Sequence, residues 1–185
     1  MTSYDVVAIA DEARAKVPLC GATRVITIDG PAGSGKTTLA SALAAELGEC
    51  AVVHMDDLYE GWTQDLNRDL AERIQHWILT PLESGHDAQH LKYDWVQCAF
   101  TEIVPVPKAP YLILEGVGSG NLALREFVSL ALWIESDPEL LIERVVDRDG
   151  EQLRDEIMRW QEHESQFHAL HQVKASAHLQ LHGDG

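Results

Sequence analysis

The sequence predicts a three-layer α/β fold, in which helices cover both faces of a mostly parallel, five-stranded β-sheet. Three observations lead to this prediction. Short apolar and β-branched runs alternate with longer amphipathic segments, which is typical of βαβ units. The strand-like runs are apolar at nearly every position, as expected of parallel strands that are buried on both faces. A glycine-rich turn joins the first of these runs to an Ala-rich helix.

The predicted elements follow one another in a regular order. The chain begins with an amphipathic helix over residues 4–17, which Pro18 and Gly21 end. The stretches with the composition of strands are residues 24–29, 51–55, 111–114, 131–134 and 177–181. The helical stretches are residues 36–47, 66–79 and 151–172, with a further helix that starts at the capping sequence of residues 136–139. Residues 81–90 are predicted to form a loop.

Length and charge limit the class of protein. A chain of 185 residues suits one domain with a substantial core, so we expect a single domain over residues 1–185. The 14 basic and 30 acidic residues give a net charge of −16, which argues against nucleic acid or an anionic membrane as a partner. The sequence contains no apolar run long enough to predict a membrane-spanning helix. Three scattered cysteines and no visible signal peptide predict a cytoplasmic protein.

Residues 30–37, Gly-Pro-Ala-Gly-Ser-Gly-Lys-Thr, match the phosphate-binding pattern G-x-x-x-x-G-K-[ST] at every fixed position. Glycines let successive backbone N–H groups turn toward a phosphate chain at the start of a helix. Lys36 would neutralise the outer phosphates, and the Thr37 hydroxyl would ligate Mg²⁺. We therefore predict a P-loop NTPase-type sandwich that binds a nucleoside triphosphate together with Mg²⁺. The predicted nucleotide-binding residues are Gly30, Ala32, Gly33, Ser34, Gly35, Lys36, Thr37 and Thr38.

Two adjacent acids follow the second predicted strand. Asp56 comes 20 residues after Lys36, and the carboxyl ends of parallel strands share one sheet edge with the phosphate loop. An acid at this edge could orient an acceptor hydroxyl, receive its proton and ligate Mg²⁺. Either Asp56 or Asp57 could instead only cap the next helix. We predict Asp56 as the base and Asp57 as a cap or a pocket residue.

Further motifs follow the phosphate loop in a fixed order: M-D-D-L-Y at 55–59, Y-D-W at 93–95, L-I-L-E-G at 112–116 and E-R-V-V-D-R-D at 143–149. Together they resemble the P-loop nucleoside kinases, in particular uridine kinases and their small bacterial relatives. The resemblance implies transfer of the γ-phosphoryl group of ATP to a hydroxyl of a small molecule, with a nucleoside as the first candidate. It also implies a kinase core over residues 24–181, after an N-terminal helix within 1–21, and a short lid at about 144–156.

The resemblance implies a role for each matching residue. Asp56 takes the place of the catalytic base, and Glu115 would help Thr37 and Asp56 to hold Mg²⁺. Arg144 and Arg148 match lid arginines that contact the phosphates and act beside Lys36. They are four residues apart and therefore share one face of a helix. The residues implied at the acceptor site are Tyr59, Tyr93 and Asp94, with Asp57 as the further pocket candidate.

Several alternatives remain open at this point. The acceptor could be a nucleoside monophosphate, a sugar or a vitamin such as pantothenate, or the protein could be an ATP-binding regulatory module without transfer activity. The segment 96–100 lacks the His and Arg that uridine kinases carry after Y-D-F, and the lid lacks their R-G. Arg68, Arg73 and Lys92 are the only Arg and Lys residues between 54 and 100. A monophosphate acceptor would need extra positive charge, so this scarcity favours a neutral acceptor. The sequence leaves open whether the chain forms a homo-oligomer.

Overall fold

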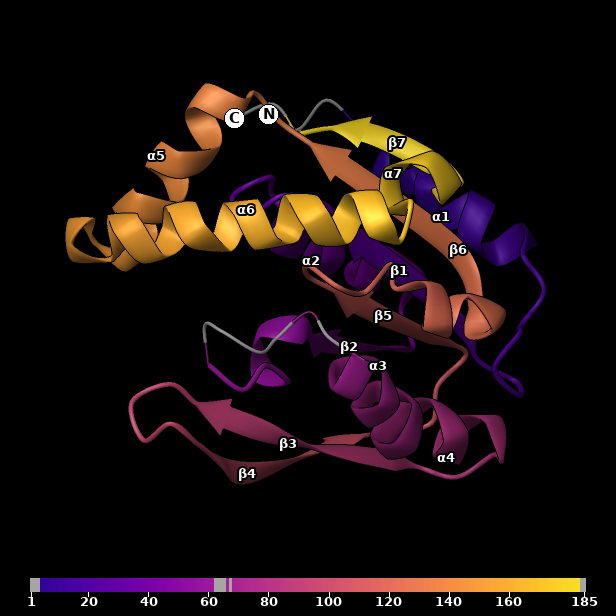
Figure 1. Ribbon diagram of the computed structural model, residues 1–185. Helices are drawn as coiled ribbons and strands as arrows, with labels where there is room; N and C mark the ends of the chain where they lie inside the picture. Colours follow the sequence, from indigo (N-terminus) through magenta and orange to yellow (C-terminus); the bar gives the residue numbers. More distant parts are fainter. Residues whose placement is uncertain (1–3, 62–65, 67, 184–185) are drawn as a thin grey trace.

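A single parallel β-sheet forms the centre of the protein in the computed structural model, which describes residues 4–61, 66 and 68–183, without the side chains of 68, 138, 139, 148 and 149. Within these residues the sheet has five strands in the order β2-β5-β1-β6-β7 (Figure 1). The strands are β1 (Arg24–Asp29), β2 (Cys50–His54), β5 (Tyr111–Glu115), β6 (Val128–Glu135) and β7 (Leu179–His182). All neighbouring pairs are parallel, which confirms the predicted fold class.

Helices cover both faces of this sheet. On one face, α1 (Val6–Ala15) and α2 (Lys36–Leu47) pack against strand residues such as Ile26 and Ile113. On the other face, α3 (Arg68–Ile74) and α6 (Arg154–Leu170) pack against the alternate residues of the same strands, for example Val25 and Leu112. Consecutive strand residues point to opposite faces, so both faces of each strand are apolar. The result is the predicted three-layer arrangement.

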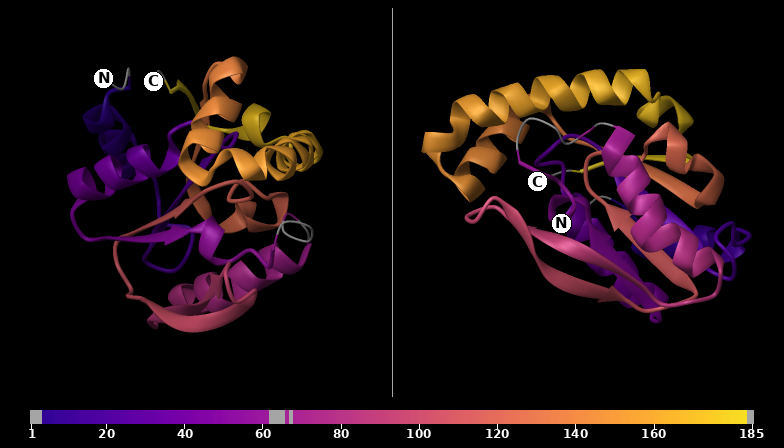
Figure 2. Two further views of the ribbon diagram at one scale, coloured as in Figure 1. Left: turned by 90° about the vertical axis from the view of Figure 1, so that its left-hand side faces the viewer. Right: turned by 60° about the horizontal axis from the view of Figure 1, so that its bottom comes forward.

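The chain between β6 and β7 runs along the carboxyl edge of the sheet. It contains α5 (Pro138–Asp149), a 3₁₀ turn η4 (Glu151–Leu153), the long helix α6 and a short helix α7 (Val173–Ser176). In Figures 1 and 2, α6 lies above α3, and the hairpin of β3 (Ala88–Asp94) and β4 (Ala99–Val106) lies below it. A further 3₁₀ segment, η3 (Leu122–Phe127), connects the loop after β5 to β6.

The predicted loop over residues 81–90 is wrong at both of its ends. The helix α3 continues through a π-helical segment η2 (Gln75–Leu79) into α4 (Thr80–Glu83), with Pro81 in the first turn of α4. A proline is tolerated there because a first-turn N–H has no intrahelical partner. At the other end, β3 (Ala88–Asp94) already begins before the predicted loop is over.

The sequence did not predict the antiparallel hairpin of β3 and β4 (Ala99–Val106). Most side chains of β4 are exposed, so this strand has no apolar run and no clear alternation. Pro105 also lies within β4, although proline normally argues against a strand. Among the described residues the hairpin forms a separate two-stranded sheet, so β4 is an edge strand, and edge strands tolerate proline.

No helix in the described ranges combines the length and the apolar character that crossing a membrane would require. The cysteines Cys20, Cys50 and Cys98 are all free thiols.

Candidate active site

The phosphate loop connects β1 to α2 at the carboxyl edge of the sheet. Gly30 has a φ of +148°, and a β-carbon at this position would collide with the backbone oxygen of Ile134. Only glycine therefore fits at the first position of the loop. The Nζ of Lys36 donates to the backbone oxygens of Gly30 at 2.9 Å and Pro31 at 2.8 Å. Because Lys36 is only 8% exposed, its ammonium group lies inside the curve of the loop.

A cavity of about 290 Å³ opens beside this loop. It brings together many of the residues that the sequence singled out: Ala32, Gly33, Gly35, Lys36, Thr37, Thr38, Asp56, Tyr59, Glu115 and Arg144. Gly30 and Ser34 belong to the same loop but do not line the cavity, and the Ser34 hydroxyl is buried. The cavity is therefore shared by the phosphate loop and by the residues that follow β2 and β5.

Oxygen donors meet at the ends of α2 and β5. The Thr37 hydroxyl donates to Oε1 of Glu115 at 3.1 Å, and Glu115 is buried at the end of β5. A hydroxyl and a carboxylate are ligands that suit Mg²⁺, which normally takes its remaining ligands from substrate phosphates and water. The described residues contain no group of three or more His, Cys, Asp or Glu side chains arranged to hold a metal by themselves. The site thus fits a metal that is shared with a nucleotide.

His54 is a site residue that the sequence analysis missed. Its Nδ1 lies 2.5 Å from Oε1 of Glu115, because His54 and Glu115 are register partners in the pairing of β2 with β5. The hydrogen bond to Glu115 raises the pKa of the His54 imidazole. A signal was present in the sequence, since His54 ends a strand at the same sheet edge as Glu115.

The two acids after β2 have separate surroundings. Both belong to the 3₁₀ turn η1 (Met55–Asp57), but only Asp56 lines the cavity, where its side chain is exposed. Asp57 instead forms an ion pair with Lys92 of β3, with 3.2 Å between Oδ1 and Nζ. The structure therefore places Asp56 beside the phosphate loop and Asp57 against the hairpin.

Tyr59 forms part of the cavity wall rather than its opening. The side chain is buried, its hydroxyl donates to the backbone oxygen of Val117 at 2.6 Å, and its ring lies 5.2 Å from that of Trp160. Burial raises the pKa of the Tyr59 phenol well above its usual value. This tyrosine therefore offers an aromatic surface and no acid–base group.

Tyr93 and Asp94 do not line the cavity. The ring of Tyr93 packs edge-to-face on Trp95 and Phe100, with centroid separations of 5.4 and 5.3 Å. The Asp94 carboxylate accepts the N–H groups of Val96 at 2.8 Å and Gln97 at 2.9 Å, which closes the turn of the hairpin. The hydrogen bonds from Gln97 lower the pKa of Asp94.

Trp95, the third residue of the Y-D-W motif, does line the cavity, although the resemblance implied roles only for Tyr93 and Asp94. Its indole N–H donates to the backbone oxygen of Asp56 at 3.3 Å. The hairpin turn is thereby attached to the segment that carries the proposed base.

Arg144 reaches the phosphate loop from α5. Its Nη1 donates to the Ser136 hydroxyl at 3.0 Å and approaches the backbone oxygen of Gly33 at 3.4 Å. Arg148 lies in the same helix, but its side chain is outside the described residues.

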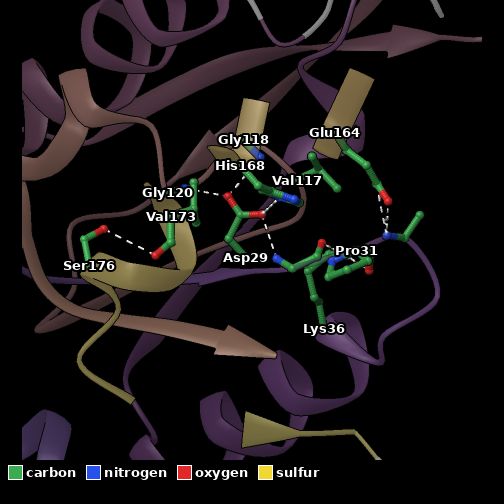
Figure 3. Close-up of polar contacts among 12 residues, drawn as sticks. Asp29, Pro31, Lys36, Val117, Gly118, Gly120, Glu164, His168, Val173 and Ser176 are labelled. Atoms are coloured by element: carbon green, nitrogen blue, oxygen red, sulfur yellow. Dashed lines mark hydrogen bonds and ion pairs between the residues drawn. The ribbon is translucent and has the colours of Figure 1, made fainter. Parts of the chain in front are cut away.

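Behind the loop, α6 contributes contacts that no local pattern predicts (Figure 3). Asp29, fully buried at the end of β1, accepts the N–H groups of Gly30 at 2.7 Å, Gly118 at 3.0 Å and Gly120 at 2.8 Å. His168 of α6 lies 3.0 Å from Oδ1 of the same carboxylate. Asp29 therefore joins the phosphate loop, the loop after β5 and α6 at one point.

Comparison with known proteins places the chain in a family. A family model described as an AAA domain matches residues 26–166. No curated protein matches the chain significantly. A solved structure from Bacillus stearothermophilus, described as a possible uridine kinase, is 19% identical with a TM-score of 0.69, over 95% of this chain and 96% of that chain.

A second solved structure, from Silicibacter sp. TM1040 and provisionally described as a fructose transport system kinase, is 19% identical with a TM-score of 0.62. The match covers 96% of this chain and 99% of that chain. At such identities the two structures establish the fold. The chain therefore belongs to the AAA domain family of P-loop proteins, and its fold is similar to that of proteins described as kinases.

Proposed function

We propose that this protein is an ATP-dependent kinase, which transfers the γ-phosphoryl group of ATP to a hydroxyl of a small molecule, with a nucleoside as the favoured acceptor. One observation carries the proposal. A single cavity contains both the phosphate loop, with Lys36 and Thr37, and the exposed carboxylate of Asp56. Phosphoryl transfer needs a phosphate cradle and a group that orients the attacking hydroxyl within the same space.

The phosphate cradle would act through charge and position. The Lys36 ammonium is held by two backbone oxygens, so it can move to a phosphate without first breaking an ion pair. The backbone N–H groups of the loop and the guanidinium of Arg144 would add further donors around the transferring group. Arg148, four residues after Arg144, is proposed as the second arginine of a lid. The backbone N–H groups are fixed by the fold, so they can stabilise transition-state charge without reorganisation.

The metal site would use Thr37, Glu115 and Asp56. A bound Mg²⁺ would neutralise charge on the phosphates. Within the chain, Thr37 and Glu115 already share a hydrogen bond, and His54 contacts the same carboxylate oxygen. His54 therefore fixes the orientation of Glu115, as an outer partner of a metal ligand commonly does.

The acceptor would enter beside Asp56, which would accept its proton. The walls there include the aromatic rings of Tyr59, Trp95 and Trp160, which suit a flat ring. The predicted substrate residues Tyr93 and Asp94 would act indirectly, by holding the hairpin turn that carries Trp95.

Basic groups are scarce near this wall, which favours a neutral acceptor over a nucleoside monophosphate. Arg73 donates to the backbone oxygen of Leu58 and to the carboxylate of Glu60 at 2.9 Å, and Lys92 pairs with Asp57. A second phosphate would have to compete with these contacts. Sugars and vitamins, which are also neutral or weakly charged, remain the alternatives that the assay must separate from nucleosides.

The test is acceptor-dependent ADP release from Mg-ATP with a panel of nucleosides, nucleoside monophosphates, sugars and pantothenate. We expect release above background with at least one neutral hydroxylated acceptor, and mass spectrometry should identify the phosphorylated product. Binding of ATP with no release for any acceptor would contradict the proposal and would favour a regulatory module. The Asp56→Asn variant is the control for ADP release that does not depend on the proposed active site.

A further inference from the structure

Glu164 of α6 reaches the phosphate loop from the side away from the cavity. Its two carboxylate oxygens lie 3.1 and 3.3 Å from the backbone nitrogen of Ala32, which donates to them (Figure 3). Glu164 is only 3% exposed and does not line the cavity, whereas Ala32 does. A single stretch of loop backbone therefore separates a buried carboxylate from the space where the phosphates of a nucleotide would lie.

The charged groups around Glu164 come from several elements. Lys36 of the loop, Asp29 of β1 and His168 of α6 all act on Glu164 through their charges. Lys174 of α7 lies in a surface pocket that Glu164 and His168 also line, and it pairs with Glu135 at 2.5 Å. Burial raises the pKa of Glu164 to about 7, while Lys36 and the Ala32 N–H act in the opposite direction.

Nucleotide binding would change the electrostatic surroundings of Glu164 in two ways. The phosphates would add negative charge on the other side of Ala32, and Lys36 would turn toward them and away from Glu164. Both changes disfavour a charged carboxylate in a buried position. The neutral carboxyl group would still accept the Ala32 N–H through its carbonyl oxygen, so the loop would keep its position.

We propose that Glu164 is a positioning residue of the phosphate loop, which takes up a proton from solvent when the phosphates of a nucleotide enter the cavity. This inference rests on the nucleotide binding in the proposed function, but it does not depend on phosphoryl transfer or on the acceptor. It assigns to α6 a direct part in setting nucleotide affinity.

The test compares the pH dependence of Mg-ADP binding in the wild type and in Glu164→Gln, by calorimetry between pH 6 and 8.5. Glutamine keeps a carbonyl acceptor for Ala32 but carries no charge. Because proton uptake opposes binding at high pH, we expect the Kd of the wild type to rise about fivefold more across this range than that of Glu164→Gln. The protonation of ADP itself cancels in the comparison. Glu162→Gln, at an exposed position two residues away on α6, should follow the wild type.

Two results would overturn the inference. Parallel pH profiles for the wild type and Glu164→Gln, with both binding Mg-ADP, would overturn it and leave the proposed function intact. A wild type that does not bind Mg-ADP at any pH would overturn both. If Glu164→Gln does not fold, calorimetry of the wild type in two buffers of different ionisation enthalpy measures the proton uptake that accompanies Mg-ADP binding. Zero uptake near pH 7 would then overturn the inference.

Discussion

The hydroxyl of Thr37, at the start of α2, donates to Oε1 of Glu115, at the end of β5, over 3.1 Å and across 78 positions of the sequence. This hydrogen bond joins the phosphate loop to the neighbouring strand at the carboxyl edge of the sheet. It places two oxygen ligands together before any metal binds. The first prediction concerns this pair.

Replacing Glu115 with glutamine should weaken the contribution of Mg²⁺ to nucleotide binding. Glutamine retains the size of the side chain but removes the charge that would attract the cation. The ratio of the Kd values for ADP without and with Mg²⁺ should fall by about tenfold, as for lost or disturbed metal ligands elsewhere. Calorimetry measures both constants. Glu102→Gln on the exposed face of the hairpin should leave the ratio unchanged, and an unchanged ratio in Glu115→Gln would remove this residue from the metal site.

Replacing Lys36 with alanine should raise the Kd for Mg-ADP by about 10- to 100-fold, since hydrogen bonds to a charged group are commonly worth 1.5–3 kcal/mol. The loop would also lose the contacts from Nζ to Gly30 and Pro31, so a folding check by circular dichroism is needed. Lys16→Ala is the matched control, because Lys16 pairs with Glu12 on the surface of α1. Unchanged affinity in Lys36→Ala would mean that nucleotide does not bind at this loop.

Replacing Asp56 with asparagine should lower kcat by about 10²- to 10⁴-fold, the usual contribution of a general base. The Kd for ATP without Mg²⁺ should change by no more than about threefold, because Asp56 lies outside the phosphate loop, whereas the Kd for Mg-ATP should rise by up to about tenfold through the lost metal ligand. Steady-state kinetics with the acceptor found by the panel, together with calorimetry, separates the two effects. Asp69→Asn, an exposed acid at the start of α3, serves as the control. Near-normal turnover in Asp56→Asn would rule this residue out as the base.

Glu164 should make the stability of the protein depend on pH. Its pKa in the folded state is about 7, above the usual 4.5, so the folded protein holds this proton more tightly than the unfolded chain. The associated stability is present below pH 4.5 and is lost as the pH rises toward 7. Relative to Glu164→Gln, the wild type should lose on the order of 3 kcal/mol of unfolding free energy between pH 4.5 and 8. Urea denaturation at both pH values measures this difference.

The control for this stability experiment is Glu162→Gln, which should retain the pH dependence of the wild type. A difference between wild type and Glu164→Gln that stays constant from pH 4.5 to 8 would show that Glu164 has the same pKa in the folded and unfolded states. That result would also remove the basis for proton uptake on nucleotide binding.

The local elements could be read from the sequence because their signals are local. The helix predicted over residues 36–47 coincides with α2, and the strand over 24–29 coincides with β1. The strand was recognised by its β-branched composition, and the helix by its alanine-rich sequence between the glycine-rich turn and Gly48, which ends α2 with a φ of +84°. The hairpin escaped prediction because β4 buries few side chains, and because one of the buried positions of β3 is occupied by the polar residue His90, so neither strand reads as an apolar run.

The proximity of Asp56, Glu115 and the phosphate loop was inferred from topology alone. Parallel strands bring their carboxyl ends to one edge, so acids that follow two different strands were expected near the loop. Which side chains point into the cavity could not be inferred in this way. Asp56 lines it and Asp57 turns to Lys92, although the two are adjacent in the sequence, because the 3₁₀ turn between β2 and Tyr59 rotates them in different directions.

The sequence by itself determined the fold class, the phosphate loop and the edge of the sheet where chemistry could occur, since each of these follows from short-range pattern or from the rules of parallel sheets. The tertiary structure alone decided that Asp29 and His168, 139 positions apart in the sequence, form a hydrogen bond, and that Glu164 accepts the N–H of Ala32, 132 positions away. These contacts depend on how α6 packs over the end of the sheet. That packing results from the sum of many weak apolar contacts, and no spacing within the sequence records it.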